Sequence, residues 1–305
     1  PAQETNALGR TLPDDAAPLA QQKISLFESD GTYMEWFKTI YRRCLPGTPP
    51  LTSEPLVRMD KNAELMPAGA TSWEPGQDGN SWYFHLRPGM QWSDGRAYTA
   101  HDYVYSFMRG ADPENAYDFE WYYRTIKNWS HVVGRRMPMD SLGLRAIDDL
   151  TLEVKTEQPV PYLPYNMIQS WATPKQAVDK YGHEWSTRAE WSVSSGPFYL
   201  HEWKKNDQVI LRVNPQYRGA TPPYLEELVF NVYSQAGQPQ ILASYEAGEV
   251  DMILLSGQAE MGRVKSDPAL KSELHSAVAF ITYYLTMNTL NPPFNDLRVR
   301  QAFGH

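Results

Sequence analysis

An alternating segment followed at once by a capped helix constrains the fold of this chain more than any other feature. SWYFHL, at 81–86, alternates as a half-buried strand does, and a Pro-Gly turn and an Asp-Gly turn follow it. Thr99 and Asp102 then have the spacing of a capping box, and apolar residues recur at helical spacing as far as Gly110. The segment 81–113 is therefore predicted to form a strand, two turns and a helix.

The pattern of elements changes along the chain from hairpins to a crossover. The segment 194–217 predicts a β-hairpin with Asn206 and Asp207 at its turn. After it, strand, helix and strand patterns follow one another between 223 and 255, which is typical of a parallel crossover unit. Hairpins followed by a crossover predict a mixed α/β protein with at least two lobes.

Four further elements are expected from periodicity and capping residues. Apolar residues at helical spacing predict a helix within 33–43, and a second helix is predicted over 172–182 with Thr173 as its cap. FITYYLTMNT, at 280–289, predicts a strand. Asp296 is expected to cap a helix at the end of the sequence.

Composition excludes several classes of function. The chain has 305 residues, a formal net charge of −8 and a pI near 5.4, whereas a nucleic-acid partner would demand a surplus of Lys and Arg. No run approaches the roughly 18 apolar residues that a membrane span requires. Cys44 is the only cysteine, which excludes an internal disulfide and a cysteine-cluster metal site. We expect a globular protein that binds no nucleic acid.

The sequence contains no familiar catalytic or cofactor motif. His183 and Glu184 lack the second histidine of a zinc-protease helix. Ser194 and Ser195 precede a predicted strand, whereas the nucleophile of a serine hydrolase follows one. No glycine-rich phosphate loop is present either. The expectation is a protein with no enzyme activity, no metal and no cofactor.

One enzyme hypothesis stays open at this point. Asp118 and Glu120 lie among aromatic residues in YDFEWYY, and paired carboxylates in an aromatic cleft are typical of glycosidases. The alternative interpretation is therefore a carbohydrate-active enzyme. Tyr and Trp are abundant in the chain, and their flat apolar faces with polar edges suit peptides as well as sugars.

Six segments in one order resemble the family 5 solute-binding proteins of bacterial ABC importers, the oligopeptide-binding and dipeptide-binding group. The most recognisable part is the strand, the WSDG turn, the TAHD cap and the helix after it. The segments that carry the resemblance are 53–74, 82–116, 143–163, 194–217, 246–252 and 287–303.

The resemblance implies a mixed α/β, periplasmic-binding-protein-like fold of class II, cluster C type. It implies a first lobe that begins at 1–50 and continues at 166–275, with an α+β subdomain inserted at 51–165. The remaining 276–305 would begin a second, C-terminal lobe whose larger part is missing here. Since such proteins enclose their ligand between two lobes, we expect these residues alone to bind it weakly.

The resemblance also implies a function. Such a protein would be the substrate-binding receptor of an ABC transporter, capturing peptides or oligosaccharides and delivering them to the transmembrane subunits of a permease. It would act as a monomer outside the cytoplasm, either in the periplasm or as a lipoprotein tethered to the outer surface. Cys44 lies too far into the chain, with no apolar run before it, to carry the lipid.

The resemblance points to three groups of ligand-binding residues. The first group would present backbone to the ligand, with a helix start facing solvent or core as an equal alternative, and consists of Gly31, Thr32, Tyr33 and Met34. The second would offer aromatic rings from the inserted subdomain and consists of Trp121, Tyr122 and Tyr123. The third would lie near the hinge and the cleft floor and consists of Ser194 and Ser195.

Overall fold

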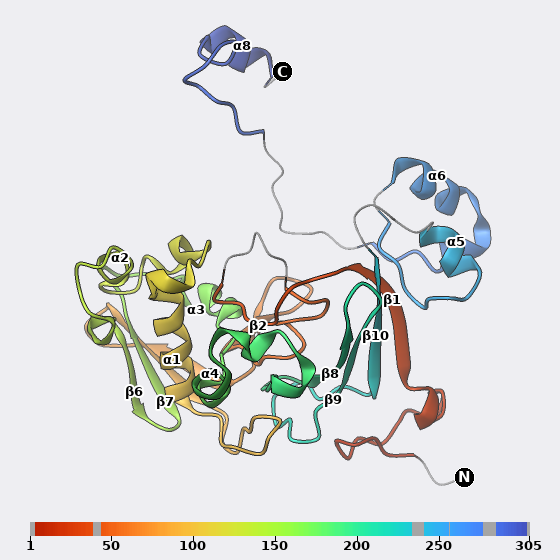
Figure 1. Cartoon of the computed structure of the whole chain (residues 1–305), viewed down its shortest axis with the longest axis horizontal. Helices are drawn as coiled ribbons and strands as arrows, with labels where there is room; N and C mark the ends of the chain where they lie inside the picture. The colour runs from red at the N-terminus through yellow and green to blue at the C-terminus, as the bar shows by residue number, and fades with distance from the viewer. Residues whose placement is uncertain (1–3, 39–43, 234–240, 256, 277–284, 304–305) are drawn as a thin grey trace. The chain divides into compact units, whose positions relative to one another are not determined.

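The computed structural model describes residues 4–38, 44–233, 241–255, 257–276 and 285–303. The chain divides into two compact units, Pro1–Leu254 and Leu255–His305. Figure 1 labels helices and strands of the two units.

The larger unit contains a mixed four-stranded sheet in the order β1-β10-β9-β8. Its strands are β1 (Lys23–Ser29), β8 (Phe198–Lys204), β9 (Gln208–Val213) and β10 (Glu227–Tyr233). The predicted hairpin is confirmed as β8 and β9, with Asn206 at positive φ in its turn. Because β1 pairs with β10 in parallel, the sheet joins segments about 200 residues apart.

The crossover after β10 is confirmed, but its second strand is reduced to a single bridge. Helix α5 (Ile241–Glu246) follows β10, and Met252 then pairs in parallel with Leu26 of β1. The predicted strand does not extend to Leu254, whose side chain is 80% exposed. With no apolar surface to cover at that position, a longer strand would gain little from burial.

A second four-stranded sheet in the same unit is entirely antiparallel, in the order β4-β5-β7-β6. Helix α1 packs against β6 and β7, as Figure 1 shows. A two-stranded ribbon, β2-β3, accompanies this sheet. The elements are β2 (Val57–Met59), β3 (Leu65–Pro67), β4 (Ala70–Pro75), β5 (Ser81–Leu86), β6 (Leu144–Asp148), β7 (Thr151–Lys155) and α1 (Ala100–Ala111).

The predicted start of α1 is confirmed, and the helix ends one residue later than predicted. The backbone N–H of Thr99 donates to Asp102 Oδ2 at 2.8 Å, which completes the capping box. Gly110 lies within the helix and does not stop it. A Cβ atom at this position would lie 2.5 Å from the ring of Phe37, so glycine permits close packing here.

The remaining helices are short. The α-helices of the larger unit also include α2 (Trp129–Val133), α3 (Leu163–Asn166) and α4 (Lys175–Tyr181). Helix α4 begins one residue later than predicted, because Pro174 and not Thr173 is its N-cap. The 3-10 helices are η1 (Leu19–Gln21), η2 (Pro113–Asn115), η3 (Glu120–Tyr123), η4 (Met139–Ser141), η5 (Met167–Gln169), η6 (Gly182–Ser186) and η7 (Ala189–Trp191).

The prediction of a helix within 33–43 is wrong for the described residues, 33–38. Residues 33–38 form no helix, and Tyr33 makes an isolated bridge with Cys44. The apolar spacing has another origin, since Met34 packs in the core of the mixed sheet while Phe37 packs in that of the antiparallel sheet. Residues 39–43 lie outside the described residues.

The smaller unit contains three described helices, α6 (Gln258–Ser266), α7 (Pro268–Ser272) and α8 (Leu297–Ala302). The cap predicted at Asp296 is confirmed, because its Oδ1 accepts the backbone N–H of Arg298 at 2.9 Å. The first half of the strand predicted at 280–289 lies outside the described residues, and the described half, 285–289, forms no strand. In the part of the chain that the structure describes, no helix has both the length and the apolar character to cross a bilayer.

The larger unit has two hydrophobic cores. The first lies against the mixed sheet and contains mainly aliphatic residues with Phe198 and Phe230. The second lies between the antiparallel sheet and α1, and it buries Trp92 and Trp129 completely. Aromatic rings therefore supply much of the buried apolar area of the second core.

We predict that Asp102→Ala lowers the free energy of unfolding by about 1–2 kcal/mol. The substitution removes the cap of α1 and leaves the buried indole N–H of Trp92 without its acceptor, 3.3 Å away. Urea denaturation measures the loss. His101→Ala, on an exposed position of the same helix, is the control and is expected to change stability by less than about 0.5 kcal/mol. Equal effects of the two substitutions would contradict the assignment.

Candidate functional site

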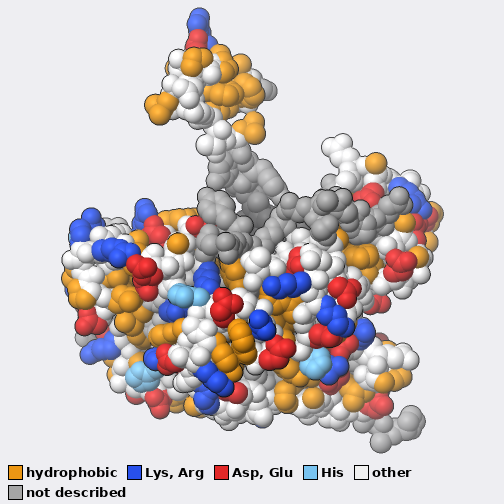
Figure 2. Space-filling model, in the orientation of Figure 1, with side chains coloured by type: hydrophobic (Ala, Val, Ile, Leu, Met, Phe, Trp, Pro, Cys, Tyr) orange, Lys and Arg blue, Asp and Glu red, His pale blue; other side chains and the backbone are white. Residues whose placement is uncertain are grey.

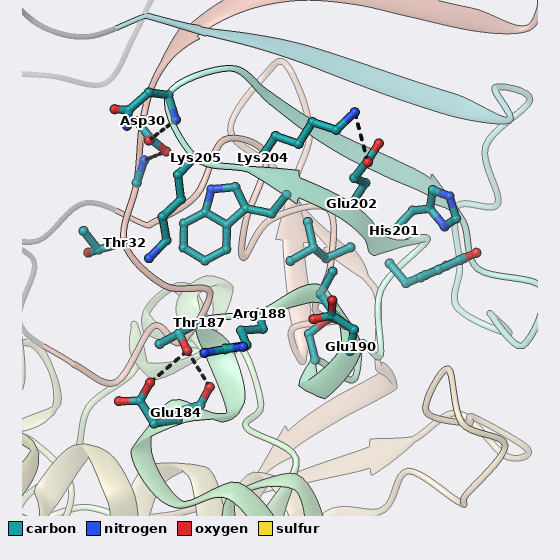
Figure 3. A pocket seen from close by; sticks show the side chains of 17 residues that line it. Asp30, Thr32, Glu184, Thr187, Arg188, Glu190, His201, Glu202, Lys204 and Lys205 are labelled. Atoms are coloured by element: carbon teal, nitrogen blue, oxygen red, sulfur yellow. Dashed lines mark hydrogen bonds and ion pairs between the residues drawn. The ribbon is translucent and has the colours of Figure 1, made fainter.

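A groove of about 1310 Å³ runs beside β8, the outer strand of the mixed sheet (Figure 3). One wall is the β8-β9 hairpin, and the other is the chain from η6 to η7. Its lining is mainly polar and charged: Asp30, Gly31, Thr32, Glu184, Thr187, Arg188, Ala189, Glu190, Ser192, Tyr199, Leu200, His201, Glu202, Trp203, Lys204, Lys205 and Asn206.

One end of the groove is fixed by Asp30. Its carboxylate accepts the backbone N–H of Gly31 at 2.8 Å and that of Asn206 at 3.0 Å. These bonds tie the end of β1 to the turn of the β8-β9 hairpin. The Thr187 hydroxyl donates to Glu184 on the opposite wall. The groove therefore has an ordered polar end.

The first group of predicted ligand residues divides between the groove and the core. Gly31 and Thr32 line the groove, and a Cβ at Gly31 would collide with the Cys44 carbonyl. Tyr33 and Met34 are buried, with exposures of 5% and 4%. Their backbone is also engaged, since the Tyr33 carbonyl accepts the N–H of Leu45 at 2.9 Å. The side chains of Tyr33 and Met34 do not line the groove.

A buried carboxylate that the sequence analysis missed follows this segment. Glu35 is 1% exposed and accepts hydrogen bonds from Arg109 of α1 at 2.7 Å and from the Trp185 indole at 2.9 Å. An isolated Glu inside the apolar run YMEWF was the available signal, because a charge at a core position must find a partner. Glu35 thus holds the segment beside α1 and η6.

The second predicted group divides in the same way. Trp121 is 54% exposed and stacks on Phe119 at a centroid distance of 5.6 Å, while Tyr122 is half-buried. Phe119 contacts Trp36, which packs edge-on against Trp171 at 4.7 Å. We call Trp121, Phe119, Trp36 and Trp171 the aromatic ladder.

Tyr123, next to the aromatic ladder in sequence, belongs to the second core. Its ring is completely buried, and its hydroxyl donates to the Gln169 carbonyl at 2.9 Å. Of the three predicted aromatic residues, only Trp121 and Tyr122 therefore reach the surface.

Ser194 and Ser195 lie in the junction between the two cores and not in the groove. Both are buried, with exposures of 1% and 3%. The Ser195 hydroxyl accepts the backbone N–H of Glu54 at 3.1 Å. The Ser194 N–H donates to the Ser93 hydroxyl at 3.1 Å, and the Ser194 carbonyl accepts the Ser93 N–H at 2.7 Å. Their contacts hold chain segments together.

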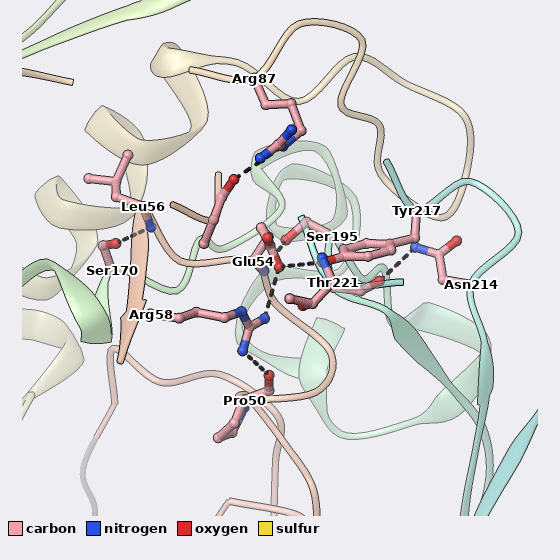
Figure 4. A network of polar contacts seen from close by, with 12 residues as sticks. Pro50, Glu54, Leu56, Arg58, Arg87, Ser170, Ser195, Asn214, Tyr217 and Thr221 are labelled. Atoms are coloured by element: carbon pink, nitrogen blue, oxygen red, sulfur yellow. Dashed lines mark hydrogen bonds and ion pairs between the residues drawn. The ribbon is translucent and has the colours of Figure 1, made fainter. Parts of the chain in front are cut away.

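Glu54 is the centre of a polar network in this junction (Figure 4). It is fully buried, and its Oε2 accepts hydrogen bonds from Arg58 at 2.8 Å and from the Tyr217 hydroxyl at 3.1 Å. Its backbone carbonyl accepts the hydroxyls of Tyr98 and Tyr103 at 2.9 and 3.1 Å. Tyr98 and Tyr103 belong to the second core, whereas Tyr217 follows β9 of the mixed sheet.

Glu120, one of the two carboxylates of the enzyme hypothesis, forms an ion pair with Arg124, one helical turn away. Within the described ranges, no cluster of three His, Cys, Asp or Glu side chains could hold a metal ion.

Charged side chains are interspersed on the face drawn in Figure 2. Lys and Arg alternate there with Asp and Glu, and no broad area carries a single sign.

Comparison with known proteins assigns this chain to a family. The model of the bacterial extracellular solute-binding proteins, family 5, matches residues 64–305. The chain belongs to this family. The resemblance found in the sequence is thereby confirmed.

Curated relatives of this family 5 protein include two from Escherichia coli K12. The probable deoxycholate-binding periplasmic protein YgiS is 37% identical over 257 residues, which are 82% of this chain and 46% of the relative. The periplasmic oligopeptide-binding protein OppA is 34% identical over 254 residues, with the same coverage. The chain spans about half the length of the curated relatives it matches.

Solved structures agree with the assignment. The substrate-binding domain of an oligopeptide ABC transporter from Bacillus anthracis matches with a TM-score of 0.71 and 28% identity, over 82% of this chain and 48% of that one. OppA of Burkholderia pseudomallei matches with a TM-score of 0.69 and 27% identity, over 85% and 54%. The predicted α/β, periplasmic-binding-protein-like fold is confirmed.

We predict that Glu54→Ala destabilises the protein by about 2 kcal/mol or more, because it leaves Arg58 and the Tyr217 hydroxyl without their buried acceptor. Glu120→Ala removes a partly exposed ion pair and is expected to cost less than about 1 kcal/mol. Chemical denaturation of both variants measures the difference. A Glu54 variant as stable as the Glu120 variant would show that the network contributes little.

We predict that the Cys44 thiol is unreactive in the folded protein. Burial, together with the negative charge of Glu35, raises its pKa to about 12. Because the thiolate is the reactive form, a disulfide reagent at pH 8 should label the native thiol roughly a thousandfold more slowly than the thiol of the unfolded chain. Labelling at similar rates in buffer and in denaturant would contradict this environment.

Proposed function

We propose that this protein is the substrate-binding receptor of an ABC importer, and that it captures peptides outside the cytoplasm. The observation that carries the proposal is the family 5 match over 64–305. The names of two relatives from Escherichia coli support it, since OppA is named as a periplasmic oligopeptide-binding protein and MppA as a periplasmic murein peptide-binding protein. The partner that receives the ligand would be the transmembrane part of a permease, and the receptor would act as a monomer.

The described surfaces suit this role. The groove brings Gly31 and Thr32 together with charged side chains, and the aromatic ladder ends in the exposed ring of Trp121. Peptides combine charged ends, polar main chain and apolar side chains, and surfaces of both kinds are needed to bind them. We propose that Thr32, Trp121 and Tyr122 contact the ligand and that Tyr33, Met34, Tyr123, Ser194 and Ser195 position the surfaces from within.

The proposed division into domains rests on the two cores. The core of the antiparallel sheet draws most of its residues from 56–172, close to the insertion proposed at 51–165. The core of the mixed sheet draws on both sides of it, from Met34 and Leu45 and from residues after 198. A subdomain inserted into a first lobe would produce this pattern.

A direct test of the function compares peptides with two other classes of ligand. A bile acid is one alternative ligand, because the relative YgiS is named as a probable deoxycholate-binding protein. An oligosaccharide is another, because aromatic surfaces also bind sugars. Calorimetric titration of the full-length gene product with a peptide mixture, cello-oligosaccharides and deoxycholate should give heat of binding only with the peptides. Binding of sugar or deoxycholate alone would replace the proposed ligand class, and glycan hydrolysis that is lost in Glu120→Gln would overturn the receptor role.

We predict that Trp121→Ala weakens peptide binding by about tenfold, because it removes an exposed ring that is already held by Phe119. Tyr224→Ala is the matched control, since this ring is also partly exposed but lies against Arg10 near the N-terminus. The same calorimetric titration measures both variants. Unchanged affinity in the Trp121 variant would remove the aromatic ladder from the proposed ligand surface.

A further inference from the structure

Two basic side chains meet at the ordered end of the groove. Arg188 directly precedes η7, and Lys205 directly follows β8. In Figure 3 they reach toward the same opening from opposite walls, beside Thr32 and Thr187. In sequence, η7, a short loop and β8 separate Arg188 from Lys205.

Neither cation is neutralised within the part of the chain that the structure describes. No described carboxylate forms an ion pair with Arg188 or Lys205, whereas the adjacent Lys204 pairs with Glu202 at 3.1 Å. Instead, each lies over an indole ring. The Lys205 ammonium is 5.3 Å from the ring centroid of Trp203, and the Arg188 guanidinium is 4.6 Å from that of Trp191.

The carboxylates at this end already have other hydrogen-bonding partners. Asp30 accepts two backbone N–H groups, and Glu184 accepts the Thr187 hydroxyl. Glu202 also lines the groove and lies near His201 in Figure 3, toward the other end, whereas Glu190 is drawn beside Arg188.

We propose that Arg188 and Lys205 form a subsite for a carboxylate group of the ligand. A guanidinium can donate two parallel hydrogen bonds to a carboxylate, and a nearby ammonium adds a third donor and a second positive charge. Stacking on Trp191 and Trp203 restrains both side chains before the ligand arrives, which lowers the entropic cost of binding. This subsite rests on the proposed peptide receptor function.

The carboxylate has two possible sources, the C-terminus of a peptide or an acidic side chain. Calorimetry on the full-length gene product can separate them with three probes: trialanine, trialanine amide and Ala-Glu-Ala amide. The wild type is expected to bind trialanine about tenfold more tightly than its amide. The preference should decline as salt is raised, because both cations are exposed.

The variants Arg188→Gln and Lys205→Gln should each reduce this preference while leaving the affinity for trialanine amide unchanged. Lys204→Gln is the matched control, since it removes a neighbouring charge that Glu202 already neutralises. Recovery of tight binding by Ala-Glu-Ala amide, lost again in the two variants, would identify a side-chain carboxylate as a ligand. Failure to recover would identify the C-terminus alone.

Two results overturn the subsite. The first is equal binding of trialanine and its amide to the wild type, and the second is a preference that persists in both variants. If none of the three probes binds the folded wild type, the peptide receptor function fails, and the subsite fails with it. Thermal melting of each variant confirms that its fold is intact.

Discussion

The buried carboxylate of Glu54 connects the two halves of the larger unit. It is inaccessible to water, so its charge must be compensated by protein donors, and Arg58 and Tyr217 supply them. The same residue accepts two tyrosine hydroxyls of the second core through its backbone. Because Tyr217 follows the mixed sheet whereas Tyr98 and Tyr103 belong to the second core, a shift of one core relative to the other would leave buried polar groups unpaired. The network therefore favours one arrangement of the two sheets.

The segment Gly31–Lys38 depends on that arrangement, because it crosses from one core to the other. Its first residues line the groove, Met34 enters the first core, and Phe37 enters the second. Glu35 is fixed between them by Arg109 and Trp185. One short stretch thus positions both candidate ligand surfaces, the groove at its start and the aromatic ladder through Trp36.

Local sequence signals predicted those parts of the fold that local interactions determine. The Thr99 cap, the β8-β9 hairpin and the Asp296 cap depend on residues within a few positions of one another, and each is present. The helix predicted within 33–43 failed for the opposite reason. Its periodic apolar residues serve two different cores, and periodicity alone cannot distinguish one buried face from two.

The candidate site was less accessible to sequence reasoning. Thr32 and Trp121 were singled out and are exposed, and Gly31 lines the groove although it is buried, but Ser194 and Ser195 pack in the junction. Glu54 and Glu35 were missed because their partners are as far as 163 and 150 residues away. Arg188 and Lys205 were missed because nothing in sequence marks a charge as unpaired. Such contacts become visible only when the chain is folded.

Hydrogen exchange on the full-length gene product, with and without a saturating peptide mixture, tests the account most directly. Bound peptide is expected to slow exchange of backbone amides in two places, at 31–32 with the groove wall at 201–206 and around Trp121, while amides of the residues buried in the two cores remain unchanged. Protection confined to other parts of the chain, or no change under conditions where calorimetry shows binding, would contradict the assignment of these surfaces to the ligand.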